Sequence, residues 1–125
     1  MDDDTKARRR ALAAHLEEKK ADIEPLDYAP YGEGVGFETP GAEWAVLTDA
    51  EADTAWDASL ESYIDECLLP EYPDDHPLVR YFDHEAWKRD ARMDGRGHSL
   101  SGYDGNEEDI EDPKTGARFV AYRTN

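Results

Sequence analysis

Apolar residues recur at helical spacing in one long stretch of the chain, from residue 48 to residue 68. The stretch opens with Thr48 and, three residues later, Glu51, which is the pattern of a capping box. It is followed by Pro70, which cannot continue a helix. We therefore predict a helix over 48–68. Its apolar residues fall within roughly 100° of arc and should form one packed face: Trp56, Leu60, Tyr63, Ile64 and Cys67.

Short runs of β-forming residues precede this helix and also close the chain. Residues 36–38 and 43–47 flank Thr-Pro-Gly-Ala at 39–42, in which Pro and Gly take the central positions of a type II turn. They predict a β-hairpin over about 36–47, on which the helix at 48–68 should pack. Residues 118–123, Arg-Phe-Val-Ala-Tyr-Arg, predict a C-terminal strand.

Two further helices are indicated, over 2–24 and over 83–94. The first has a thin apolar stripe and stops before Pro25, and the second starts at Asp83 as N-cap. The glycine-rich residues 95–105 predict a flexible loop.

These elements predict an α+β fold, in which a small antiparallel sheet is packed by helices. The sheet would consist of the hairpin at about 36–47 and the strand at about 118–123. The chain has 125 residues, which fits one domain over 25–125, preceded by a helix or mobile segment over 1–24.

Acidic and basic residues are distributed unevenly along the chain, which bears on its function. The chain has 31 acidic and 14 basic residues, for a net charge of −17. Residues 21–79 contain sixteen acids and neither Lys nor Arg, whereas the flanking segments are close to balanced. Such a protein is not expected to bind nucleic acid or anionic membranes through a basic face. Segregated charge favours a partner of opposite sign, while adaptation to high salt or a plain solvated face is the competing interpretation.

The helix predicted over 48–68 places part of this charge in a row. Acids follow one another at four-residue steps of about 6 Å along the axis, close to the roughly 6–7 Å between successive phosphates of a nucleic-acid strand. The first two, Asp49 and Asp53, are explained by the helix N-terminus, where carboxylates are favoured. The expected partner-binding carboxylates point outward from this helix or follow it: Glu51, Asp57, Glu61, Asp65, Glu66, Glu71, Asp74 and Asp75.

One run of residues in the last third of the chain is similar to part of a known protein family. Residues 81–90, Tyr-Phe-Asp-His-Glu-Ala-Trp-Lys-Arg-Asp, together with the closing aromatic strand at 119–123, resemble the C-terminal module of ArdA-type antirestriction proteins. That family consists of DNA mimics from phages and plasmids, whose carboxylates imitate duplex phosphates and occupy type I restriction–modification enzymes. The resemblance covers roughly 45 residues and implies an acidic inhibitor of a host defence nuclease.

Catalytic and metal chemistry are not indicated. The single cysteine, Cys67, should lie on the apolar face of its helix, where it is a poor nucleophile, and the four histidines lack the spacing of metal ligands. Arg96 and His98 could hold an anion in the glycine-rich loop, but no phosphate-binding or nucleophile motif surrounds them. We therefore expect no enzyme, no cofactor and no metal.

Taken together, the sequence predicts a non-catalytic acidic protein that binds the basic nucleic-acid-binding groove of a restriction–modification enzyme or a CRISPR nuclease. A homodimer would lengthen the charged surface. The acidic N-terminus and the lack of a long apolar run predict a cytoplasmic protein of the host cell without a membrane span. The alternative is a salt-adapted interaction protein without mimicry.

Overall fold

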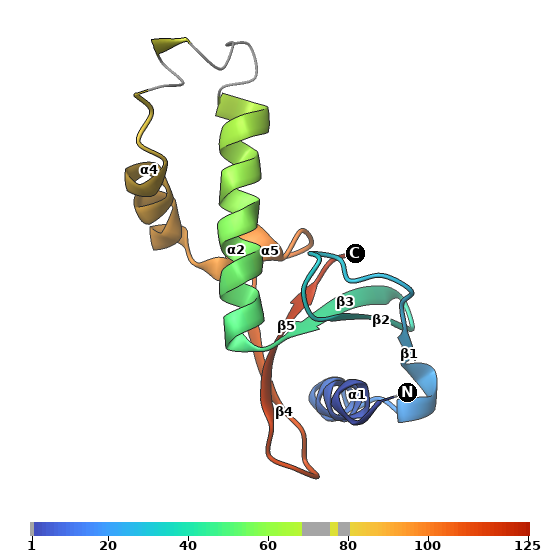
Figure 1. Ribbon diagram of the computed structural model, residues 1–125. Coiled ribbons are helices and arrows are strands. Elements are labelled where there is room, and N and C mark those ends of the chain that lie inside the picture. The colour runs from blue at the N-terminus through green and yellow to red at the C-terminus, as the bar shows by residue number, and fades with distance from the viewer. Residues whose placement is uncertain (1, 69–75, 78–80) are drawn as a thin grey trace.

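The computed structural model describes residues 2–68, 76–77 and 81–125 (Figure 1). An antiparallel sheet has the strand order β1-β2-β3-β5-β4, and helices cover both of its faces, which confirms the predicted α+β fold. The strands are β1 Glu24–Pro25, β2 Val35–Thr39, β3 Ala42–Leu47, β4 Glu108–Glu111 and β5 Arg118–Arg123. The helical elements are α1 Asp3–Leu16, η1 Lys20–Asp22, α2 Asp49–Tyr63, η2 Ile64–Leu68, α4 His84–Ala91, η3 Arg92–Asp94 and α5 Arg96–Leu100.

The predicted hairpin and C-terminal strand are both present. Thr39 pairs with Ala42 at the end of β2 and β3, and Gly41 has a φ of +78°, the conformation that a type II turn requires there. β5 lies beside β3 rather than at the hairpin's other edge. β4 was not predicted from the sequence. Its residues Glu-Asp-Ile-Glu include one apolar side chain, Ile110, which pairs opposite Phe119.

β3, at the centre of the sheet, and its neighbour β5 are buried on both faces. In β3, Trp44 and Val46 face the cluster that contains α1, whereas Ala45 and Leu47 face the cluster formed with α2 and α5. This double burial explains the unbroken apolar runs of β3 and β5, since a strand with one solvated face would alternate.

α1 is shorter than the helix predicted over 2–24. It ends at Leu16 because Glu17 adopts a left-handed conformation, with φ of 56°, and its N–H caps the carbonyls of the last turn. The polar residues that follow have no apolar face to bury, so the chain turns through η1 and inserts Ile23 into the core. The thin stripe of α1 is nevertheless fully used, and its Leu12 is completely buried.

α2 begins with the predicted capping box and then extends beyond the sheet (Figure 1). Ala52 and Ala55, in its first half, pack under the sheet with Leu100 of α5. Further along, Leu60 and Ile64 of the predicted apolar face are buried, but the prediction is wrong for Tyr63, which is 49% exposed, and for Cys67, which is exposed. The helix changes to a π-helix at Ile64, which shifts the register of the last residues.

The region from α2 to α5 therefore contains an arm, which we define as residues 57–68 and 84–94. The helix predicted over 83–94 is confirmed, with Asp83 accepting the backbone N–H of Ala86 at 3.0 Å and η3 forming its last turn. The predicted flexible loop at 95–105 is wrong in part, because α5 occupies its first half. Gly97 in α5 is buried so closely that a Cβ there would lie 2.7 Å from the carbonyl oxygen of Gly105.

Candidate functional site: the acidic row of α2

The acidic row of α2 lies against a matching row of basic side chains from the C-terminal third of the chain. The basic row also advances in steps of four residues, and the two rows run in opposite directions. We call their contact the ionic seam. It consists of Asp49, Asp53, Asp57 and Glu61 from α2 and of His84, Lys88, Arg92 and Arg96 from α4, η3 and α5.

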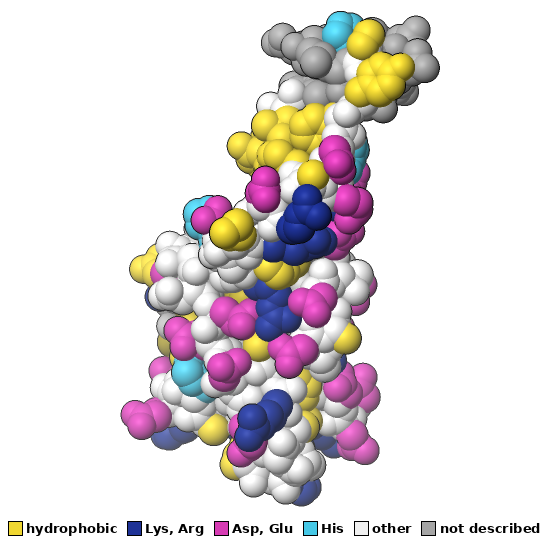
Figure 2. Space-filling model, turned by 90° about the vertical axis from the view of Figure 1, so that its left-hand side faces the viewer, with side chains coloured by type: hydrophobic (Ala, Val, Ile, Leu, Met, Phe, Trp, Pro, Cys, Tyr) yellow, Lys and Arg dark blue, Asp and Glu magenta, His cyan; other side chains and the backbone are white. Residues whose placement is uncertain are grey.

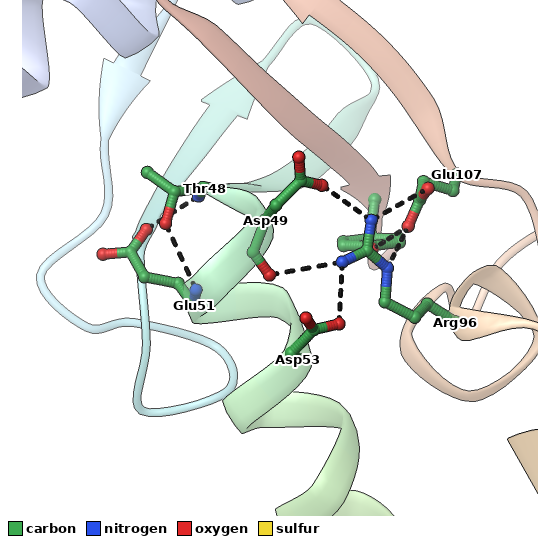
Figure 3. Close-up of polar contacts among 7 residues, drawn as sticks. Thr48, Asp49, Glu51, Asp53, Arg96 and Glu107 are labelled. Atoms are coloured by element: carbon green, nitrogen blue, oxygen red, sulfur yellow. Dashed lines mark hydrogen bonds and ion pairs between the residues drawn. The ribbon is translucent and has the colours of Figure 1, made fainter.

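Arg96 anchors the end of the seam that is nearest the sheet (Figure 3). Its guanidinium donates to Asp49 at 2.8 Å and to Asp53 at 3.0 Å, and it forms a bidentate pair with Glu107. Glu107 also accepts the hydroxyl of the buried Tyr122. Arg96 is already bound by three carboxylates. It is therefore not free to bind another anion, although its place in the glycine-rich stretch of the sequence allowed that interpretation.

Lys88 forms the middle of the seam. Its side chain is buried, and its ammonium contacts Asp57 at 3.0 Å and Glu61 at 3.1 Å, together with Glu85 of its own helix at 3.1 Å. Arg92 contacts the same Asp57 at 2.8 Å. These contacts fix α4 to the outer half of α2, which with η2 also contains the buried Leu60 and Ile64.

The far end of the seam is His84, whose Nδ1 lies 2.6 Å from Glu61. Beside it, the ring of Tyr63 stacks on Trp87 with centroids 5.5 Å apart. Figure 2 shows this side of the molecule, where Lys and Arg side chains lie among Asp and Glu and apolar side chains gather on the arm above them.

These contacts shift the pKa values of Lys88 and Glu61. Hydrogen bonding to Asp57, then to Glu85 and Glu61, raises the pKa of Lys88 well above its usual value. Hydrogen bonds from His84 and Lys88 lower the pKa of Glu61. Lys88 and Glu61 therefore favour their charged forms, and their contact between α4 and α2 is charge-assisted around neutral pH.

The predicted site residues separate into three groups in the structure. Asp57 and Glu61 lie in the seam, so they are not the free carboxylates that the sequence suggested, although their side chains remain 50% and 40% exposed. Glu51 points the other way, to Arg8 of α1, at 2.6 Å. Asp65 and Glu66 are exposed on η2, while Glu71, Asp74 and Asp75 lie outside the described residues.

Glu51 belongs to the attachment of α1. Arg8 is buried and reaches both oxygens of Glu51, the carbonyl of Val46 and, within its own helix, Asp4. Burial opposes ionisation of Glu51, but the hydrogen bonds from Arg8 and Thr48 outweigh it and lower its pKa. Arg8 thus docks the N-terminal helix on the acidic half of the chain.

The remaining carboxylates are distributed over the whole surface. Acids without an ion pair among the described residues occur on α1, on η1, on four strands, on η2, at the end of α4 and on η3: Asp3, Asp22, Glu24, Glu38, Glu43, Asp65, Glu66, Asp90, Asp94 and Asp109. The segregation of charge along the sequence is thus much weaker in space.

Other chemistry near the seam is limited. A hollow of about 600 Å³ between α2 and the C-terminal helices is lined by Tyr63, Trp87, Cys67 and His98, among others. Among the described residues, no three His, Cys, Asp or Glu side chains are arranged to hold a metal ion. In the same part of the chain, no helix is long and apolar enough to cross a bilayer.

The fold and the seam define an acidic α+β protein in which basic side chains of the same chain partly neutralise the carboxylates of α2. Comparisons with protein-family models, curated proteins and solved structures found no significant match to this chain. The resemblance to ArdA-type proteins therefore stays a prediction.

Proposed function

We propose that this protein is a non-catalytic binding protein whose carboxylates compete with nucleic acid for the basic groove of another protein. The observation that carries the proposal is the row on α2, which combines phosphate-like spacing with side chains that remain solvent-accessible. Asp57 and Glu61, which the sequence assigns to partner binding, are 50% and 40% exposed even though Lys88 binds them.

The seam supports this function by fixing the carboxylates in place. A side chain that is already held by an ion pair loses less conformational entropy when a second cation binds its free oxygen. The net charge of −17 adds long-range attraction for a basic groove, which raises the association rate and weakens as salt screens the charges. Restriction–modification enzymes are the favoured target class, on the resemblance of residues 81–90 and 119–123.

The test replaces carboxylates that do not stabilise the fold and measures whether inhibition is weakened. Reversing the charge of Asp57 and Glu61 would release Lys88 and disturb the arm, so a loss of inhibition would be ambiguous. Asp65 and Glu66 are exposed and form no ion pair with the described residues. The double variant Asp65→Asn/Glu66→Gln therefore removes two charges from the tip of the row while leaving the seam intact.

Binding of labelled duplex DNA to a type I restriction enzyme would be followed by fluorescence anisotropy in the presence of each variant. We expect Asp65→Asn/Glu66→Gln to weaken competition about tenfold. The control Asp27→Asn/Asp109→Asn removes two exposed charges elsewhere and should change it less than about twofold. Equal loss in both variants would show that total charge, rather than this row, determines binding.

A salt-adapted interaction protein is the second candidate, because unpaired acids occur on nearly every element of the fold. In that case molar salt should be needed for folding. Urea unfolding in about 0.05 M and about 2 M KCl distinguishes the two, since a DNA mimic should already be folded in the dilute buffer.

A further inference from the structure

Residues of α1 and η1 line a basic pocket. These two elements lie at the opposite side of the sheet from the arm (Figure 1). It has a volume of about 270 Å³, and the residues that line it are all basic: Lys6, Arg9, Arg10 and Lys20. Three come from two adjacent turns of α1, and Lys20 comes from η1. Four adjacent cations are unexpected in a chain whose acids outnumber its bases 31 to 14.

These cations are largely unneutralised by the chain itself. Arg10 binds Asp112 through Nε and Nη2, both at 2.8 Å, which leaves its third nitrogen uncommitted. Lys6, Arg9 and Lys20 form no ion pair with any described residue. Like charges held together raise the free energy of the fold unless an anion screens them.

Arg9 supplies an independent observation. One of its terminal nitrogens donates to the backbone carbonyl of Lys20, which holds the guanidinium at the pocket. Its Nε is buried and has no hydrogen-bond acceptor, and no other buried side-chain nitrogen or oxygen in the described part of the chain lacks a partner. Buried N–H groups normally have an acceptor, so Arg9 retains hydrogen-bonding capacity that the described residues do not satisfy.

We propose that this pocket binds a phosphate group. A guanidinium fork matches the oxygens of a tetrahedral oxyanion, and lysines add point charges around it. The volume accommodates phosphate with a small organic group attached, so the ligand is either free phosphate or the phosphate of a small phosphomonoester. This site is separate from the α2 row, and its presence or absence leaves the proposed function untouched.

The test is calorimetric titration of the full chain at low ionic strength with inorganic phosphate, ribose 5-phosphate and acetate. We expect saturable phosphate binding with a dissociation constant of about 1 mM or tighter. Tighter binding of ribose 5-phosphate than of phosphate would identify a phosphomonoester as the ligand, and the reverse order would identify free phosphate. Acetate should bind at least about tenfold more weakly, because it lacks the third oxygen and the second charge.

Two variants locate the site. Lys6→Gln/Lys20→Gln changes two exposed side chains and should weaken phosphate binding at least about tenfold, while Lys114→Gln/Arg118→Gln, with the same loss of charge elsewhere, should change it less than about twofold. Arg9→Lys keeps the charge but removes the fork and should weaken binding about threefold or more. Absence of saturable phosphate binding, equal loss in the pocket and control variants, or equal affinity for acetate would overturn the proposal.

Discussion

The molecule attaches its two outer helical regions to the sheet by different physical means. α1 buries Leu12 and a set of alanines against the sheet, and its ion pair from Arg8 to Glu51 is itself largely buried. The arm buries Leu60 and Ile64 but leaves Tyr63 half exposed, and its helices are joined by the ionic seam, whose carboxylates are substantially exposed. Packing scarcely responds to salt, whereas exposed ion pairs are screened, so the two regions should respond differently to the same change.

The largest expected effect comes from the packed region. Leu12 is completely buried in the α1 cluster, so Leu12→Ala should lower the free energy of unfolding by about 3 kcal/mol. Tyr63→Ala in the arm removes a half-exposed ring and its stacking on Trp87, and should cost about 1 kcal/mol. Urea unfolding followed by circular dichroism measures both. Equal losses would contradict the contrast between the two regions.

A smaller and more local effect is expected in the arm. Lys88→Gln removes the cation shared by three carboxylates, and we expect a loss of about 1 kcal/mol, since its partners are substantially exposed. Amide hydrogen exchange should accelerate in α4 and remain unchanged in α1. Uniform acceleration across both helices would mean that the arm and the sheet unfold as one unit.

A further effect concerns acid. Arg10 lowers the pKa of the buried Asp112, with support from Thr115 and the backbone N–H of Lys114, although burial opposes ionisation. Between its native and unfolded pKa values the unfolded chain binds more protons, so stability is present above about pH 4 and is lost as the pH falls. In Asp112→Asn, the unfolding midpoint should depend less steeply on pH between about 5 and 2. An unchanged slope would show that other carboxylates account for acid sensitivity.

The sequence predicted the elements that carry strong local signals. The capping box at Thr48, the turn with Gly41 and the strand at 118–123 each depend on neighbouring residues, and each is present. β4 could not be recognised, because one apolar residue gives no alternation to detect. The exposure of Cys67 depends on how far α2 extends beyond the sheet, which is a tertiary property.

The sequence contains a signal for the seam that the prediction of free carboxylates leaves out. The acidic four-residue period on α2 has a basic counterpart of the same period in His84, Lys88, Arg92 and Arg96. Two oppositely charged rows of equal period can pair along antiparallel helices, and that comparison needs only the sequence. The charge segregation therefore reflects, in part, a partner of opposite sign that lies within the same chain.

The most direct test of the ionic seam is a double-mutant cycle on the free energy of unfolding with Asp57→Asn and Lys88→Gln. We predict a coupling energy of about 0.5–1 kcal/mol in dilute buffer that falls in about 1 M KCl, whereas the exposed pair of Glu111 and Arg118, at 3.5 Å, should show almost none. A coupling at the seam no larger than that of the exposed pair would contradict the account, because the two charged rows would then be neighbours that do not stabilise each other.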